Sequence, residues 1–171
     1  MTLKLPPPSA RYGGFRTFGD VMNLALPAYA LTRSAADSDW EGSLQLAYTT
    51  ALSQTAVWIL KNTTKIRRPT WQPGDNGKMY SFPSGHTASV FSAASYLHLR
   101  YGWKEALIPY SLAAATGCSR VWANAHRKSE ALVGAALAVG FSLLVVRPRE
   151  DSSLEIIPVE GGAAIVYTRD L

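Results

Sequence analysis

The sequence predicts an all-α protein: a compact helical bundle of about five to six helices with a C-terminal β-hairpin appendix. Three observations lead to this prediction. Apolar residues recur at helical spacing through most of residues 19–148. Pro69, Gly102 and Pro148 follow periodic segments, at positions where helices stop. Beyond residue 148, β-branched residues flank a Glu-Gly-Gly turn signal, a pattern typical of a hairpin.

The first elements follow from composition and spacing. Residues 1–18 are rich in Pro, Gly and Arg and predict an irregular N-terminal arm. Gly19–Leu31 predicts a short helix that Pro27 interrupts. Because Asp20 and the other early residues are polar, this segment reads as a structural helix and not as a clear signal peptide. Whether an export signal preceded it stays open.

The later elements complete one helical domain. A long helix runs from Glu41 to about Ile66, and a loop rich in Pro, Gly, Asp and Asn follows it. The remaining helices are expected from Ser84 to about Tyr101, over roughly Lys104–Val121 and over roughly Lys128–Val146. The sequence therefore divides into an arm (1–18), a helical domain (19–148) and a tail with the hairpin (149–171).

Composition narrows the class of protein. The chain has 171 residues, enough for one domain with a core, and 47% of them are hydrophobic. Mean hydropathy is 0.00, and no run of about 18 uninterrupted apolar residues marks a spanning helix. The net charge of +5 either favours solubility or attracts anionic lipid or phosphate. Because the sequence contains no nucleic-acid-binding motif, nucleic acid is not expected as a partner.

Three short segments carry the residue types of a phosphate site. They are Lys61, six residues, then Arg68-Pro69; Pro83-Ser84-Gly85-His86; and Ser119-Arg120, five residues, His126, then Glu130. Each segment alone has an ordinary interpretation: a solvated basic stripe, a helix cap with a chance histidine, or a surface His–Glu pair. Together they supply three cations, two histidines and a carboxylate, with a helix start whose amides can bind an anion.

The chemistry of phosphoryl transfer explains why these residue types belong together. Such transfer depends mostly on positioning and on electrostatic stabilisation of the phosphoryl oxygens. The spacing of Lys61, Lys65 and Arg68 predicts one basic helical face. A carboxylate four residues after His126 can fix the tautomer of that imidazole and leave its other nitrogen free to attack.

The order and spacing of the three segments resemble the signature of the type 2 phosphatidic acid phosphatase superfamily. That signature is Lys-x6-Arg-Pro, Pro-Ser-Gly-His and Ser-Arg-x5-His-x3-Asp, and the resemblance covers roughly Leu44 to Phe141. The superfamily includes lipid phosphatases, bacterial acid phosphatases and vanadium haloperoxidases. The resemblance implies metal-independent hydrolysis of a phosphomonoester or pyrophosphate through a phosphohistidine, with no cofactor and with vanadate as an inhibitor.

The resemblance also assigns roles. It implies that His126 is the nucleophile, and that His86 protonates the leaving oxygen and later activates water. It implies a phosphate-binding set of five residues: Lys61, Arg68, Ser84, Gly85 and Arg120. The sequence departs from the family at Glu130, which stands where the family has aspartate.

The substrate class rests on weaker signals. The apolar composition favours a lipid-linked phosphate, and relatives of this kind usually act at the outer side of the bacterial inner membrane. The expected location is therefore the bacterial cell envelope, periplasmic or inner-membrane-associated, with a membrane surface as a further partner. A broad-range soluble acid phosphatase stays open. So does a phosphate-binding pseudoenzyme, because of Glu130, while a vanadate haloperoxidase ranks lowest. The oligomeric state is not predicted.

Overall fold

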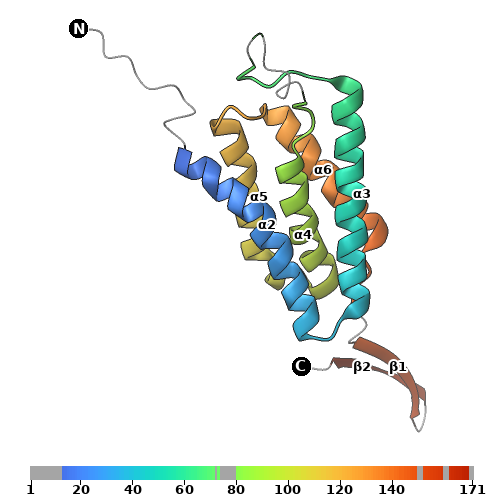
Figure 1. Ribbon diagram of the computed structural model, residues 1–171. Coiled ribbons are helices and arrows are strands. Elements are labelled where there is room, and N and C mark those ends of the chain that lie inside the picture. The colour runs from blue at the N-terminus through green and yellow to red at the C-terminus, as the bar shows by residue number, and fades with distance from the viewer. Residues whose placement is uncertain (1–12, 72, 74–79, 150–151, 160–161, 170–171) are drawn as a thin grey trace.

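The computed structural model describes residues 13–71, 73, 80–149, 152–159 and 162–169. Within them the chain forms five α-helices: α2 (Gly13–Ala36), α3 (Trp40–Thr64), α4 (Gly85–Tyr101), α5 (Trp103–Trp122) and α6 (Lys128–Val145). Consecutive helices run in alternating directions along the bundle (Figure 1). The predicted all-helical bundle is confirmed.

Helix α4 is the centre of the bundle, because it packs against each of the other four described helices (Figure 1). Its buried surface consists mainly of small side chains, and Ala88, Ala93 and Ala94 are fully buried. Small side chains let neighbouring helices approach closely. The larger Tyr96 and Leu97 fill the space near the end of α4 and are fully buried as well.

Helix α2 begins earlier than the sequence predicted. Residues 13–18, predicted as part of the irregular arm, are helical, whereas residues 1–12 of that arm lie outside the described residues. The ring of Phe15 contacts the rings of Phe18 and Trp122 at centroid distances of 5.7 and 5.2 Å. This packing against α5 outweighs the low helix propensity of the two glycines that begin α2.

Pro27 does not interrupt α2, which continues to Ala36 instead of ending at Leu31. A proline cannot donate to the carbonyl four residues earlier, here that of Asn23. The hydroxyl of Ser89 in α4 donates to this carbonyl at 3.1 Å. The acceptor that Pro27 leaves open is thus satisfied from the neighbouring helix.

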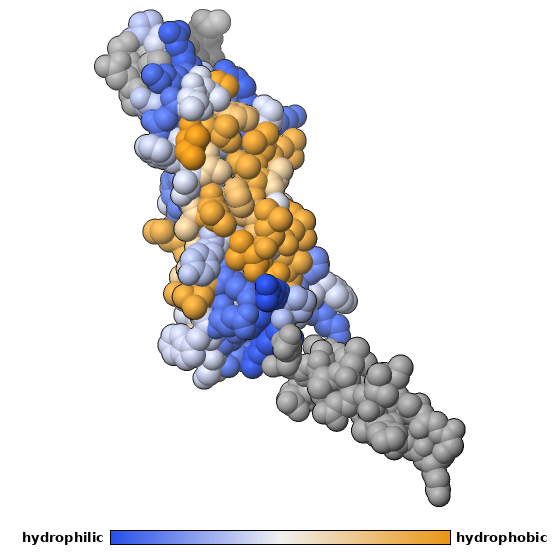
Figure 2. Space-filling view, turned by 90° about the vertical axis from the view of Figure 1, so that its right-hand side faces the viewer, coloured by the Kyte–Doolittle hydropathy of each residue, from blue (hydrophilic) through white to orange (hydrophobic). Residues whose placement is uncertain are grey.

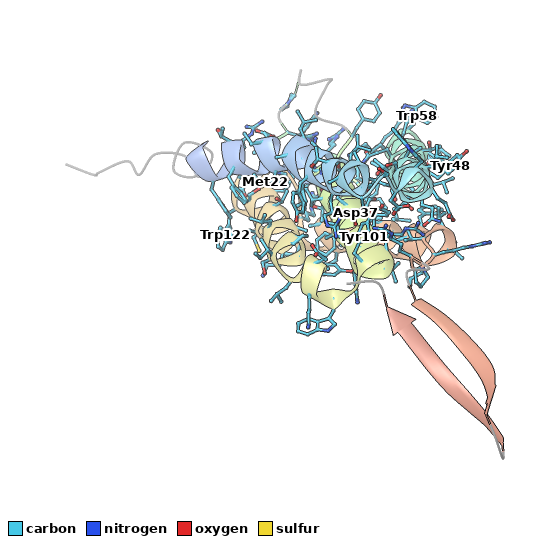
Figure 3. All side chains as sticks on the ribbon, turned by 90° about the horizontal axis from the view of Figure 1, so that it is seen from below. Met22, Asp37, Tyr48, Trp58, Tyr101 and Trp122 are labelled. Carbon is cyan, nitrogen blue, oxygen red and sulfur yellow. The ribbon has the colours of Figure 1, made fainter. Side chains whose placement is uncertain are left out.

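The apolar stripe of α3 faces outwards. Large side chains at the predicted helical spacing are exposed: Leu44, Tyr48, Leu52 and Trp58. Figure 3 shows Tyr48 and Trp58 projecting away from the bundle. The side chains that α3 buries are mostly polar or small: Gln45, Thr49 and Ser53 among them. The spacing of these apolar residues correctly predicts a helix, but the face of α3 that carries them does not form the core of the bundle.

A buried ion pair closes the end of the bundle where α2 leads into α3. The Arg100 guanidinium donates to both carboxylate oxygens of Asp39, at 2.6 and 2.8 Å. The Tyr101 hydroxyl donates to the same carboxylate at 2.8 Å. Nearby, Asp37 pairs with Arg33 at 2.5 Å. This end of the bundle is held by charge-assisted hydrogen bonds.

The chain continues into two strands, β1 (Ser152–Val159) and β2 (Gly162–Arg169). They pair antiparallel, with Ser152 opposite Arg169. A lone two-stranded hairpin is only marginally stable in water. The hairpin as an independently stable appendix therefore stays a prediction.

Candidate active site

The three sequence segments meet at one end of the bundle (Figure 1). The alternating topology places the ends of α3 and α5 beside the starts of α2, α4 and α6. The first segment leaves α3, the second begins α4, and the third forms the turn between α5 and α6. Residues that are far apart in sequence therefore become neighbours.

His126 and Glu130 form a buried pair at the start of α6. The His126 Nδ1 atom lies 3.1 Å from the Glu130 Oε2 atom, and the two residues are only 4% and 2% exposed. The Nε2 atom of His126 has no hydrogen-bond partner among the described residues. A carboxylate on one ring nitrogen thus leaves the other nitrogen available.

Glu130 is held by more groups than His126. Its Oε2 atom also accepts from the Arg127 backbone N–H at 3.1 Å and from the Ser81 hydroxyl. Its Oε1 atom accepts from the Arg127 guanidinium at 2.8 Å. The bond from the Arg127 amide to Glu130 is the carboxylate half of a capping box at the start of α6, since the arginine side chain has no acceptor for the other half. The longer glutamate side chain therefore caps the helix and orients His126 at the same time.

Backbone contacts join the second and third segments. The Ser84 N–H donates to the Glu130 carbonyl at 2.9 Å. A Cβ atom added at Gly134 would lie 2.5 Å from the Ser84 carbonyl oxygen, so α6 packs directly on the start of α4. The Ser84 hydroxyl accepts from the Thr87 hydroxyl at 2.9 Å and caps α4. At Gly85 an added Cβ would make only ordinary contacts, so packing does not require glycine there.

Lys61 reaches the site from the last turn of α3. Its ammonium group donates to the carbonyls of Tyr80 and Ser81 at 3.0 and 3.3 Å. Burial and, after it, the Arg68 charge lower the pKa of Lys61 to about 8, while the Glu130 carboxylate opposes the change. Two donors of the ammonium group are thus used to hold the loop before α4.

Arg68 reaches the site on a loop, which corrects the prediction of a shared helical face with Lys61 and Lys65. Helix α3 ends at Thr64, and Lys65 takes a left-handed conformation with φ of 47°. The Nε atom of Arg68 is buried and has no partner within the described part of the chain. Burial lowers the pKa of Arg68. An unpaired buried guanidinium N–H costs free energy unless an acceptor binds it.

The electrostatics keep His126 neutral. Burial, followed by the charges of Lys61 and Arg68, lowers the pKa of His126 to about 4, and the Glu130 carboxylate opposes this shift. A neutral imidazole is the form that can act as a nucleophile. Burial and the two nearby cations together therefore favour the neutral form of His126.

A second cluster joins His86 and Arg120 through a residue that the sequence analysis did not place in the site. The Asp20 Oδ1 atom accepts from Arg120 Nη1 at 2.6 Å and lies 3.0 Å from His86 Nε2. In the sequence, Asp20 argues against a signal peptide, and a lone acid in an apolar helix is also a usable signal for a functional site. Ser81 was also missed, and no sequence pattern pointed to it.

The two clusters are continuous. The Arg120 carbonyl accepts from the His126 backbone N–H at 3.2 Å. The charge of Arg68 lowers the pKa of both His86 and His126. The structure thus brings all eight candidate residues to one end of the bundle, and Gly85 lies there as the first residue of α4.

Comparisons with known proteins identify the family of this chain. The model of the PAP2 superfamily matches residues 42–153. A lipid A 4'-phosphatase of Helicobacter pylori is 34% identical over 140 residues, which are 74% of this chain. A lipid A 1-phosphatase of Porphyromonas gingivalis is 42% identical over 62 residues, or 34% of this chain. The matches span 66% and 14% of those two proteins.

The fold is similar to a solved structure. The crystal structure of Aquifex aeolicus LpxE matches with a TM-score of 0.66 and 22% sequence identity, over 83% of this chain and 87% of that one. The family match covers well over half of the chain and includes all three motif segments. The chain belongs to the PAP2 superfamily.

Proposed function

We propose that the protein is a metal-independent phosphatase that hydrolyses a lipid-linked phosphomonoester or pyrophosphate through a phosphohistidine. The observation that carries this proposal is the buried His126–Glu130 pair, 3.1 Å apart, in the field of two nearby cations. A neutral imidazole with one nitrogen held by a carboxylate is arranged for nucleophilic attack at phosphorus.

The proposed reaction has two steps. The His126 Nε2 atom attacks phosphorus, the bond from phosphorus to the leaving oxygen breaks, and His86 gives its proton to that oxygen. Water then attacks the phosphohistidine while His86 takes a proton from it. The N–P bond breaks, phosphate leaves, and both histidines return to their starting states.

The donors available to the phosphoryl oxygens support this scheme. An ammonium group carries three N–H donors and a guanidinium five. Lys61 uses two of its three, and Arg120 uses one each at Nε, Nη1 and Nη2, to Ser119, Asp20 and Arg16. Arg68 contributes a buried Nε–H without a partner among the described residues. All three cations therefore retain N–H groups for an anion.

A lipid-linked substrate is supported by the outer surface. Figure 2 shows an apolar band between two polar ends of the bundle. Exposed apolar residues of α3 and α6 include Leu44, Leu52, Ile59, Leu132 and Leu144. By length and composition α6 is the one described helix that could cross a membrane. We propose that this apolar band faces lipid in the bacterial cell envelope, with the site at a polar end.

A groove next to the site supports the same substrate class. It lies between α4, α5 and α6, has a volume of about 370 Å³ and is mostly apolar. Its lining includes Thr87, Phe91, Gly117, Ala131 and Leu132. Thr87 also donates to the Ser84 hydroxyl at the start of α4, so one lining residue of the groove contacts a residue of the site. We propose that it receives a hydrocarbon chain of the substrate.

The test is phosphate release by the purified protein in detergent. The panel contains a lipid A phosphate, a phosphatidate, an isoprenoid diphosphate and an aryl phosphate, and His126→Ala is the control. We expect turnover of at least one lipid substrate, no loss in chelator, and inhibition by vanadate, which can mimic the five-coordinate transition state. A preference for soluble phosphates would favour a broad-range acid phosphatase. No turnover of any substrate would favour a phosphate-binding pseudoenzyme.

A further inference from the structure

We propose that Asp20 is a positioning residue of the active site, supplied by α2, which orients His86 and holds Arg120. This inference rests on the proposed function, because it concerns how His86 transfers its proton. Asp20 lies outside residues 42–153, the range that the PAP2 family model matches. It is also outside the three motif segments.

The geometry gives each histidine a carboxylate. The Glu130 carboxylate contacts Nδ1 of His126 and leaves Nε2 free. The Asp20 carboxylate contacts Nε2 of His86 at 3.0 Å, and Nδ1 of His86 has no hydrogen-bond partner within the described part of the chain. Two imidazoles are thus oriented through opposite ring nitrogens, which suits one for attack and the other for proton transfer to the leaving oxygen.

The approach of α2 to Arg120 is built into the backbone. A Cβ atom added at Gly19 would lie 2.7 Å from Arg120 Nη2 and would also collide with the Ser119 hydroxyl. The Arg16 carbonyl, one helical turn before Asp20, accepts from the same Nη2 atom. Positions 16, 19 and 20 therefore share one face of α2, and that face seats the Arg120 guanidinium.

A purely structural ion pair is a weaker explanation. The side chain of Asp20 is 49% exposed, and ion pairs with an exposed partner add little to stability. The partners of Asp20 are instead two groups of the proposed reaction. We therefore expect its loss to change catalysis more than folding.

The charges around His86 predict a change in the pH dependence of activity when Asp20 is replaced. The facing charged groups are Arg120 from α5, Asp20 from α2 and Arg68 from the loop after α3. Burial and Arg120 lower the pKa of His86, Asp20 opposes them, and Arg68 adds to the lowering. Removing the Asp20 charge should lower that pKa further. The alkaline limb of activity, where His86 loses its proton, should then move to lower pH.

The experiment compares wild type, Asp20→Asn and Asp20→Glu on p-nitrophenyl phosphate and on phenyl phosphate, whose leaving group needs a proton more. We expect Asp20→Asn to lower kcat by roughly 10- to 100-fold, since a positioned acid contributes about 10²–10⁴. The loss of kcat in Asp20→Asn should be larger on phenyl phosphate than on p-nitrophenyl phosphate, and the alkaline limb of its pH profile should move to lower pH. Asp20→Glu, which keeps the carboxylate, should recover part of the rate. Asp37→Asn, which removes another carboxylate paired with arginine, is the matched control.

The outcomes are distinct. An unmoved alkaline limb with equal losses on both substrates would overturn the inference while leaving the proposed function intact. A higher kcat/KM in Asp20→Asn would also overturn it, because Asp20 would then compete with substrate for Arg120. An inactive wild type would reject the proposed function itself. The melting temperature of each variant shows whether a rate loss comes from unfolding.

Discussion

Glu130, in the first turn of α6, lies four residues after His126, and its Oε2 atom is 3.1 Å from the Nδ1 atom of His126. The same carboxylate accepts from the Arg127 amide and from the Ser81 hydroxyl. Orientation of the nucleophile and capping of α6 therefore depend on one side chain. A change at Glu130 should affect both.

Glu130→Gln should cost far more activity than Glu130→Asp. An amide can donate to Nδ1 and stabilise the wrong tautomer, and loss of the corresponding charge in a catalytic triad costs about 10⁴ in kcat. Aspartate keeps the charge but withdraws the oxygens by roughly 1 Å, a misplacement that costs about 10². The measurement is kcat of both variants on one substrate. Equal rates for wild type and Glu130→Gln would show that Glu130 does not orient His126.

The acid limb of kcat/KM should lie near pH 4. The pKa of His126 is lowered to about 4, so the imidazole stays neutral and nucleophilic above that pH and becomes protonated below it. Lys61→Met removes a nearby positive charge, so the pKa of His126 should rise and the limb should move to higher pH. Lys104→Met, at the start of α5, is the control and should leave the limb in place. A limb near pH 6.5 in wild type would contradict the electrostatic argument.

Gly134→Ala should destabilise the protein and reduce its activity. The added Cβ would lie 2.5 Å from the backbone carbonyl of Ser84, which is not free to move away. Overpacking of this kind costs about 1–3 kcal/mol. Gly140→Ala is the matched control in α6, because no other described segment comes within 4 Å of its added Cβ and alanine favours helix by up to about 1 kcal/mol. Melting temperatures in one detergent should fall for the first variant and not for the second.

Lysines at Leu52 and Ile59 together should weaken binding to lipid vesicles while turnover of a soluble aryl phosphate is kept. Both side chains are exposed on α3. If each is buried in lipid, it contributes about 1.5–3 kcal/mol to vesicle binding, and the substitution by lysine removes this contribution. Thr64→Lys adds charge at the polar end of the same helix and should leave vesicle binding unchanged. The measurement is co-sedimentation with vesicles at high salt. Unchanged sedimentation of the double variant would show that this surface does not face lipid.

The helices and the site segments could be predicted because their signals are local. The serine cap at Ser84 and the glycine at Gly102 mark helix ends through backbone geometry that neighbours in sequence determine. The spacing of His126 and Glu130 is local as well. Such features do not depend on what packs against them.

Other features depend on contacts that the sequence does not encode locally. The period of α3 is the same whether its apolar face is buried or faces outwards, so the sequence could not show the exposure of Leu44 or Tyr48. Asp20 contacts Arg120 across 100 positions, and that contact exists only because α2 packs beside α5. The length of α2 likewise follows from the packing of Phe15 on Trp122.

Two contacts between α2 and α4 share the same sequence offset. Asp20 contacts His86, the Asn23 carbonyl accepts from Ser89, and each pair is 66 positions apart. The two helices thus run in the same direction with a fixed register. Pro27 leaves the Asn23 carbonyl without its helical donor, and Ser89 of α4 donates to it instead. A proline, which usually disrupts a helix, thus helps to fix the position of α2 along α4. A shift of a single residue would break both contacts, so Pro27 sets the alignment on which the Asp20–His86 pair depends.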